Sequence, residues 1–360
     1  MTPNPESPLF YYGILGEGWG HFSRACVLVP ELLEAGYGVR LFSSGEVLDA
    51  LRDRFPECLS EATPQPRFTY RDNALDLRVR LLPHLALFCR GLAATRRCAA
   101  RMRREQPLAV VSDFEPIVAR AAAWTGTPLI ALDHQQVISE YDVRPAPPMQ
   151  GSIRPVCRAN RMAYPRPAMR IVSSFFYPRL RGGYTARTTR LVGPLLRKGV
   201  LARAPRNEGH VVVYQTSPTL HWLDSLLDAL PGEKRVYGAA VQDGPGIVAR
   251  QKDETTFLDD LASCRFAVVN GGHTAITEAL HFGKPLICLP VRRQAEQEIN
   301  ALWVSRLGFG RAYWPEPGEI PDFTGFLARE ALFRRNIRRH GIPCGNDKAL
   351  RLLREFLSRS

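Results

Sequence analysis

The chain has 360 residues and carries 48 Lys and Arg against 35 Asp and Glu, which gives a formal charge of +13. Hydrophobic residues make up 45% and charged residues 23%, the balance of an ordinary globular protein. The length excludes a miniprotein and predicts about two domains, and the composition excludes a disordered or collagen-like chain.

No stretch approaches the roughly 20 apolar residues of a membrane-spanning helix, and Met1–Pro8 has neither the cationic nor the apolar segment of a signal peptide. The eight cysteines form no CxxC pair and no Cys/His cluster with the spacing of a zinc site. They are most simply buried thiols in a reducing compartment. We therefore expect a cytoplasmic protein with no cleaved signal and no bound metal.

Short apolar runs alternate with turns and helical stretches, the pattern of an α/β fold whose parallel sheets are covered on both faces. Strands are predicted at 10–15, 39–43, 109–112, 129–132, 170–174, 211–214, 235–237, 266–269 and 286–289. Helices are predicted at 22–35, 75–105, 116–124, 219–230, 255–262, 274–282, 296–307 and 347–360.

Two segments interrupt this pattern. Residues 145–167 are rich in Pro and Arg and predict an irregular connection, and a second break covers 193–209. We place the interdomain linker at the second break, because strands restart cleanly after it. The predicted domains are residues 1–195 and 196–345, followed by a helix at 346–360 that could pack back on the N-terminal domain.

The first candidate ligand loop is Gly16-Glu17-Gly18-Trp19-Gly20-His21, between a predicted strand and a predicted helix. Its glycines permit a tight turn and a close approach of a ligand to the backbone, and the helix N-terminus presents free N–H groups. The spacing is not that of the dinucleotide fingerprint, and the second strand ends in Ser43-Ser44 rather than an acidic residue. This argues against nicotinamide binding and leaves a plain strand-to-helix turn as the alternative.

The second candidate loop runs from Asn270 to Glu278 and again joins a strand, a glycine turn and a helix. Its backbone amides and the Thr274 hydroxyl would meet a phosphate at the helix N-terminus. Glu278 lies one helical turn beyond Thr274, where its carboxylate can accept from both hydroxyls of a ribose. The alternative is a solvated glutamate, but ligands of open α/β sheets bind at this edge.

A third candidate follows the strand at 286–289, where Glu296 and Gln297 begin the next helix. Acid and amide side chains there are suited to hydrogen-bond several hydroxyls of a sugar. By composition alone, helix capping and solvation explain them equally well.

The run NGGHTAITEALHFGKPLICLPVRRQAEQEINA, which begins at Asn270, resembles the donor-binding region of glycosyltransferases with the GT-B fold. It is similar both to UDP-glycosyltransferases and to the bacterial lipid II N-acetylglucosaminyltransferase. With GEGWGHFSR, SDFEP, LDHQ and VGPLLR, the chain most resembles a bacterial and archaeal family of uncharacterised GT-B glycosyltransferases. The resemblance implies two Rossmann-like domains facing across a cleft, the N-terminal one for the acceptor and the C-terminal one for a nucleotide-sugar donor.

The resemblance also implies donor contacts. In the UDP-glycosyltransferase pattern a His-Cys-Gly turn precedes a glutamate; here Asn270 stands at the His position, Gly272 at the Gly and Glu278 at the Glu. Phosphate contact by an imidazole at position 270 is therefore lost. The phosphate candidates become Thr274 and the amides of Gly272 and His273, and Glu278 becomes the ribose ligand.

Further donor contacts follow from the same resemblance. The Asp-Gln pair that holds sugar hydroxyls in the family becomes Glu296-Gln297, and Thr216 and Ser217, after the first strand of the second domain, are additional phosphate candidates. The ribose carboxylate implies a ribonucleotide, and UDP is the common choice in this fold.

For catalysis, the resemblance places His21 at the position of the general base and Asp113 at that of the acid that orients it. An aspartate-oriented imidazole is a sound base near neutral pH. Gly18, Trp19 and His134 are the acceptor-site candidates. The alternative is a helix-capping His21 and a structural Asp113.

Basic charge is concentrated between Arg71 and Arg104, where the sequence contains nine arginines and only two acidic residues, Asp72 and Asp76. As an amphipathic helix, this segment could lie on an anionic membrane at its cytoplasmic face and reach a lipid-linked acceptor. The alternative is a solvated helix face.

Together, these patterns predict an inverting, metal-independent glycosyltransferase that moves a hexose-type sugar from a UDP-sugar to a hydroxyl acceptor, with no cofactor beyond the donor. Two alternatives stay open: a non-hydrolysing nucleotide-sugar epimerase and a non-catalytic binder of nucleotides or nucleic acid. No zinc finger, aromatic RNA-binding signature or DNA-reading helix is recognisable, so no nucleic-acid partner is expected.

Overall fold

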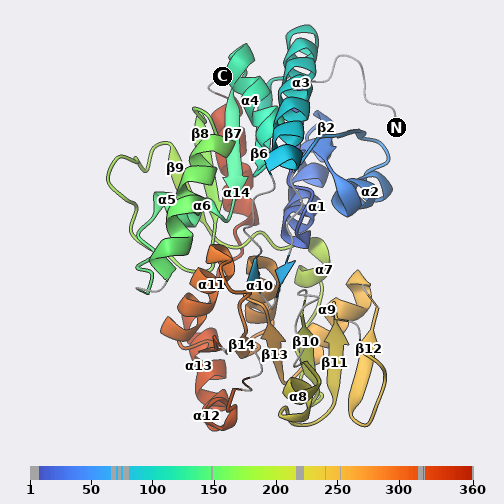
Figure 1. Cartoon of the computed structure of the whole chain (residues 1–360), viewed down its shortest axis with the longest axis vertical. Coiled ribbons are helices and arrows are strands. Elements are labelled where there is room, and N and C mark those ends of the chain that lie inside the picture. Colours follow the sequence, from blue (N-terminus) through green and yellow to red (C-terminus); the bar gives the residue numbers. More distant parts are fainter. Residues whose placement is uncertain are drawn as a thin grey trace.

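Two parallel sheets, one above the other in Figure 1, form the body of the protein. The computed structural model describes residues 8–65, 70–71, 74–75, 81–146, 149–215, 223–239, 241–251, 253–314, 319 and 321–358. The sheets have seven and six strands and are covered by helices. The α/β class predicted from the sequence is confirmed.

The N-terminal sheet has the strand order β3-β2-β1-β6-β7-β8-β9. Its strands are β1 (Leu9–Ile14), β2 (Gly38–Ser43), β3 (Leu59–Ala62), β6 (Ala109–Asp113), β7 (Leu129–Asp133), β8 (Met169–Ser173) and β9 (Thr189–Val192). The helices are α1 (Trp19–Glu34), α2 (Gly45–Arg54), α3 (Leu81–Glu105), α4 (Pro116–Thr125), α5 (Gln136–Glu140) and α6 (Gln150–Ala163). A separate antiparallel pair joins β4 (Tyr70–Arg71) to β5 (Ala74–Leu75).

The second sheet has the order β12-β11-β10-β13-β14-β15. Its strands are β10 (Val211–Tyr214), β11 (Lys234–Tyr237), β12 (Ile247–Arg250), β13 (Phe266–Val269), β14 (Leu286–Cys288) and β15 (Gly310–Ala312). The helices of this half are α7 (Lys198–Leu201), α8 (Leu223–Asp228), α9 (Glu254–Ser263), α10 (His273–His281), α11 (Ala295–Arg306), α12 (Thr324–Leu327) and α13 (Glu330–His340). Because β10 and β13 are central and parallel, their carboxyl ends open toward the first sheet.

The last helix, α14 (Asn346–Leu357), returns to the N-terminal sheet. Its buried residues Ala349, Leu350, Leu352 and Leu353 belong to the same apolar core as α1 and the interior strands of that sheet. The end of the chain therefore stabilises the half of the molecule in which the chain began.

The sequence interpretation of residues 145–167 as an irregular connection is wrong. Helix α6 spans Gln150–Ala163 and contains Pro155. Pro155 has no N–H to donate to the carbonyl of Gly151, four positions earlier. The helix loses this one backbone hydrogen bond and continues.

The basic segment starting at Arg71 is also not one helix. Arg71 lies in β4, and α3 begins at Leu81, while Arg78 and Arg80 lie outside the described residues. On α3, Arg90, Arg96, Arg97, Arg103 and Arg104 are exposed, whereas Arg101 pairs with Glu61. Within the part of the chain that the structure describes, no helix is long and apolar enough to cross a bilayer.

Glu115 makes the stability of the fold depend on pH. It caps α4, its Oε2 accepting from the Val118 N–H at 2.7 Å, and complete burial raises its pKa from 4.5 to about 7. The folded protein therefore holds this proton more tightly than the unfolded chain, and its free energy of unfolding falls as pH rises through that window.

We expect Glu115→Gln, which keeps an acceptor for the cap without the charge, to stabilise the protein by up to about 3 kcal/mol at pH 8 and much less at pH 5. Urea unfolding at the two pH values measures this. The exposed Glu57→Gln is the control, and an equal gain at both pH values would show that Glu115 does not titrate as stated.

Candidate functional site

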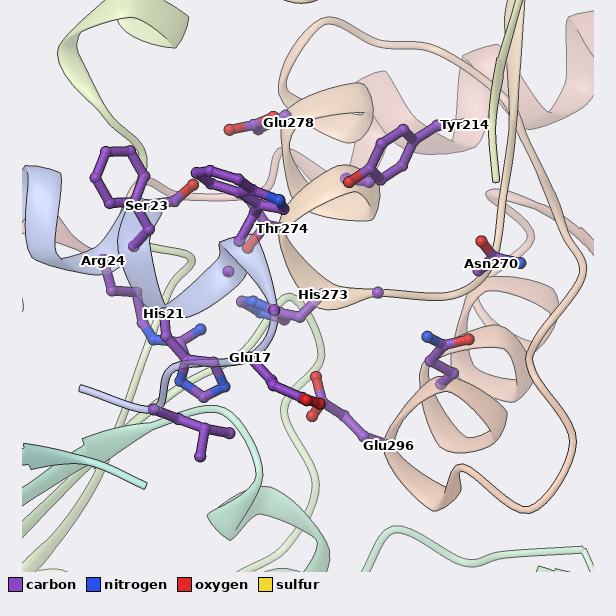
Figure 2. A pocket seen from close by; sticks show the side chains of 18 of the residues that line it. Glu17, His21, Ser23, Arg24, Tyr214, Asn270, His273, Thr274, Glu278 and Glu296 are labelled. Atoms are coloured by element: carbon purple, nitrogen blue, oxygen red, sulfur yellow. The ribbon is translucent and has the colours of Figure 1, made fainter. Parts of the chain in front are cut away.

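A cavity of about 330 Å³ lies between the two sheets. The loop after β1 and the start of α1 form one wall, and the ends of β10 and β13 with α10 and α11 form the other (Figure 2). The predicted site residues that line it are Gly18, Trp19, His21, Gly272, His273, Thr274, Glu278, Glu296 and Gln297. Segments more than 250 residues apart in the chain therefore meet in one chamber.

Helices α1 and α10 direct their N-termini into this cavity. Their N-cap positions are Gly18 and Gly272, which have no side chain to satisfy the first N–H groups of the helix. The preceding Gly271 has φ 96°, and a Cβ there would lie 2.7 Å from the Gln297 carbonyl oxygen, so only glycine permits the turn. Both helix ends offer open donors and partial positive charge to an anion.

His21 and Asp113, predicted as a pair, are brought together. His21 Nδ1 lies 2.7 Å from Asp113 Oδ1, and the two side chains are buried where α1 meets the end of β6. Arg24, one turn along α1, donates to both Asp113 oxygens, at 2.6 and 2.8 Å. Burial alone would raise the pKa of Asp113, but Arg24 and His21 hold it below its usual value. The carboxylate stays ionised and fixed.

Sequence reasoning missed Arg24, although a signal was present. An arginine one turn after His21 lies on the same helix face, and a buried arginine needs an acidic partner.

Glu278 is buried at the cavity wall and held by a second arginine that sequence reasoning missed. Arg197 donates to its two oxygens at 2.9 and 3.2 Å, and also lies 3.1 Å from Glu254 Oε2. Burial raises the pKa of Glu278, while Arg197 opposes the rise. Because a carboxylate has about four acceptor positions, two remain for a ligand. Arg197 lies in the predicted linker, at the end of the VGPLLR motif, which was interpreted only as a connection.

His273 lines the cavity and stacks on His134, with ring centroids 3.8 Å apart. Its Nε2 is buried and has no hydrogen-bond partner among the described residues. Burial lowers its pKa well below the usual value, so the ring is neutral at pH 7. An unpartnered imidazole nitrogen beside a helix N-terminus is ready to contact a ligand.

His134 lies behind the cavity wall rather than in it. Its Nδ1 is 2.7 Å from the Ser173 carbonyl oxygen and its Nε2 is 2.8 Å from Asn300 Oδ1 on α11. Asn300 in turn donates to the Gly271 carbonyl at 3.1 Å. His134 thus joins the two halves of the molecule, and the acceptor role predicted for it has no support in the cavity lining.

The remaining predicted residues differ in their surroundings. Glu296 is half-buried, and Gln297 Oε1 accepts from the Val291 N–H at 2.9 Å, which fixes its side chain. Trp19 is 37% exposed, at the cavity rim. Thr216 and Ser217 lie outside the described residues.

An aromatic wall completes the cavity. Tyr214 and Tyr237 each contact Phe257, with ring centroids 5.3 and 5.1 Å apart, and all three line the chamber. Aromatic faces of this kind can stack on a flat ring. Among the described residues, no group of three or more His, Cys, Asp and Glu could hold a metal ion.

Comparison with known proteins gives one family. The model described as Glycosyl transferase family 1 matches residues 9–329. An uncharacterised glycosyltransferase of Methanosarcina acetivorans is 23% identical over 374 aligned positions, covering 96% of this chain and 97% of the relative.

Solved structures share the whole architecture. A UDP-glucosyltransferase from Polygonum tinctorium that glucosylates indoxyl superposes with a TM-score of 0.69 at 13% identity, covering 98% of this chain and 99% of its own. The glycosyltransferase VinC, solved with dTDP, gives 0.59 at 16% identity, covering 98% and 100%. At these identities the likeness shows the fold, which is the GT-B arrangement expected from the sequence.

Proposed function

The chain belongs to glycosyl transferase family 1, and from this premise we propose that it moves a hexose-type sugar from a UDP-sugar to a hydroxyl acceptor, with inversion and without a bound metal. The observation that carries the proposal is the shared cavity: the buried His21–Asp113 pair and the Glu278–Arg197 pair face one chamber from opposite halves of the molecule. We assign the donor to residues 196–345 and the acceptor to residues 1–195.

The nucleotide-sugar donor fits the cavity wall formed by α10 and α11. The diphosphate lies at the N-terminus of α10, against Thr274, the amide of Gly272 and the unpartnered Nε2 of His273. Glu278 accepts from the ribose hydroxyls, and Glu296 and Gln297 bind those of the sugar. Of the relatives, one is a UDP-glucosyltransferase and another was solved with dTDP, which has no 2′-hydroxyl. The spare acceptor positions on Glu278 favour the ribonucleotide.

The catalytic step uses His21 and Asp113, from the wall formed by α1. We assign the ring proton of His21 to Nδ1, which donates it to Asp113, so that Nε2 takes the proton of the acceptor hydroxyl. The acceptor oxygen attacks the anomeric carbon from the face opposite the diphosphate, so the new C–O bond forms as the bond to UDP breaks. The leaving diphosphate is stabilised by the N–H groups of α10.

His273→Ala is expected to weaken UDP binding about tenfold or more, since it removes one hydrogen bond to a charged group, and to leave uridine binding unchanged. Calorimetric titration with both ligands measures this. His281→Ala, at the other end of α10, is the matched control. Equal losses for UDP and uridine would mean that His273 shapes the cavity rather than contacting phosphate.

Product analysis tests the proposed function. The protein is incubated with UDP-sugars and a mixture of hydroxyl acceptors, and we expect a new glycoside of inverted configuration and one UDP per glycoside. A changed sugar stereochemistry without any acceptor would instead identify an epimerase. Binding of random DNA with no UDP binding would identify a nucleic-acid binder.

A further inference from the structure

The whole positive charge of the protein resides in one segment. Between Asp142 and Glu208 the sequence contains 13 Arg and one Lys and no acidic residue. Without these 14 cationic residues, the rest of the chain has 34 Lys and Arg against 35 Asp and Glu. The rest of the chain is thus close to neutral, and only part of the segment's positive charge is paired with acidic residues outside it, as in the contacts of Arg197 and Arg203.

Much of this segment folds onto one side of the molecule, around α6 and the loop between β8 and β9 (Figure 1). The loop is held beside the end of α5, where Arg181 N–H donates to the Glu140 carbonyl at 2.9 Å and Asp142 N–H to the Arg179 carbonyl at 2.8 Å. Seven exposed arginines form what we call the arginine face: Arg154, Arg158, Arg161, Arg166, Arg179, Arg187 and Arg190.

These arginines lack acidic partners in the part of the chain that the structure describes. No ion pair joins any of the seven to an acidic residue within the described ranges, whereas the half-buried Arg170 lies 3.7 Å from Glu140. Unpaired guanidinium groups on one surface attract a polyanion.

Apolar side chains on the same segment favour a membrane over nucleic acid. Met162 on α6 is 60% exposed, and Tyr177 in the loop is 53% exposed. Helices that lie in a membrane interface combine cationic residues with such side chains, and tyrosine is enriched at that depth.

The inner side of α6 meets the wall of the cavity. Asn160 is buried and donates to the carbonyl of Gln135 at 3.0 Å, and Gln135 lines the cavity. Arg154, Arg158 and Arg161 point outward from the same helix. A surface bound to them would lie about one helix diameter, or 10–12 Å, from the chamber.

We propose that the arginine face docks the protein on a membrane rich in anionic phospholipid. Resting on the proposed function, this docking would hold the cavity wall that carries His21 next to hydroxyl acceptors embedded in that membrane. It assigns membrane contact to α6 and the following loop rather than to α3.

Vesicle flotation tests the proposal with matched variants. Wild type is expected to float with vesicles of phosphatidylcholine and phosphatidylglycerol, less so at high salt, and not with phosphatidylcholine alone. R154E/R158E/R161E should lower the partition coefficient about a hundredfold or more, since each arginine near an anionic surface contributes about 1 kcal/mol. R96E/R97E/R104E on α3 makes the same change in charge and should float like wild type. R154Q/R158Q/R161Q, a milder change, guards against misfolding of the first variant.

Thermal unfolding and UDP titration of every variant separate the two proposals. Loss of flotation by R154E/R158E/R161E with an unchanged melting temperature supports docking, whether or not that variant binds UDP. If the wild-type protein binds UDP but does not float, the proposed function stands and docking is overturned. Equal flotation on neutral vesicles, a loss confined to the α3 variant, or tighter binding of random duplex DNA than of anionic vesicles would also overturn it.

Discussion

His21→Ala is expected to lower the rate of sugar transfer by about 10²–10⁴-fold, the contribution of a positioned general base. UDP affinity should not change, because His21 lies on the opposite wall of the cavity from the donor contacts that we propose on α10 and α11. Steady-state rates and UDP titration of the same preparation measure the two effects.

Asp113→Asn extends this prediction. An amide at this position can donate to His21 Nδ1, which would leave the proton on Nε2 and remove the base without removing the ring. The loss should therefore approach that of His21→Ala, while His281→Ala, a histidine outside the cavity lining, keeps wild-type turnover. Unchanged turnover in His21→Ala would leave His21 and Asp113 as structural residues.

Glu278→Gln should have the second largest effect, a fall in UDP affinity of about 10–100-fold, the range for hydrogen bonds to a charged group. The amide offers one acceptor oxygen in place of two and leaves the largely buried Arg197 without the carboxylate that its Nε and Nη2 contact. Calorimetric titration with UDP measures the loss.

A nucleotide lacking one hydroxyl isolates the ribose contact. Wild type should bind 2′-deoxy-UDP at least about tenfold more weakly than UDP, because a site built for a hydroxyl is left unpaired without it. Glu278→Gln should discriminate less. Asp259→Asn removes a carboxylate that pairs with Arg203 outside the cavity and serves as the control. Equal binding of the two nucleotides by wild type would contradict the ribose role.

The interior of each sheet was predictable from the sequence, but the edges were not. All nine predicted strands are interior strands, whereas β3, β9, β12 and β15, which the pattern missed, are the four sheet edges. Interior strands are covered on both faces and show unbroken apolar runs. An edge strand such as β3, with the sequence Leu-Ser-Glu-Ala, has no fully buried residue and therefore resembles a loop.

The site also has features that the sequence predicted and features that it did not. The glycine turns and the following helices fix local positions, so the sequence alone placed His21 and Thr274 at helix N-termini beside the carboxyl ends of strands, and Glu278 one turn further along. The pairing of Arg197 with Glu278 and the stacking of His134 on His273 depend on how the linker and the two halves pack. Neither contact leaves a periodic signal in the sequence.

Calorimetric titration of the wild-type protein with UDP, UDP-sugars and GDP-sugars is the decisive test of the proposed donor site. We predict that UDP binds, that one UDP-sugar binds in the same site, and that the GDP-sugars do not compete. Absence of binding by every nucleotide would contradict the assignment of this cavity as a donor site.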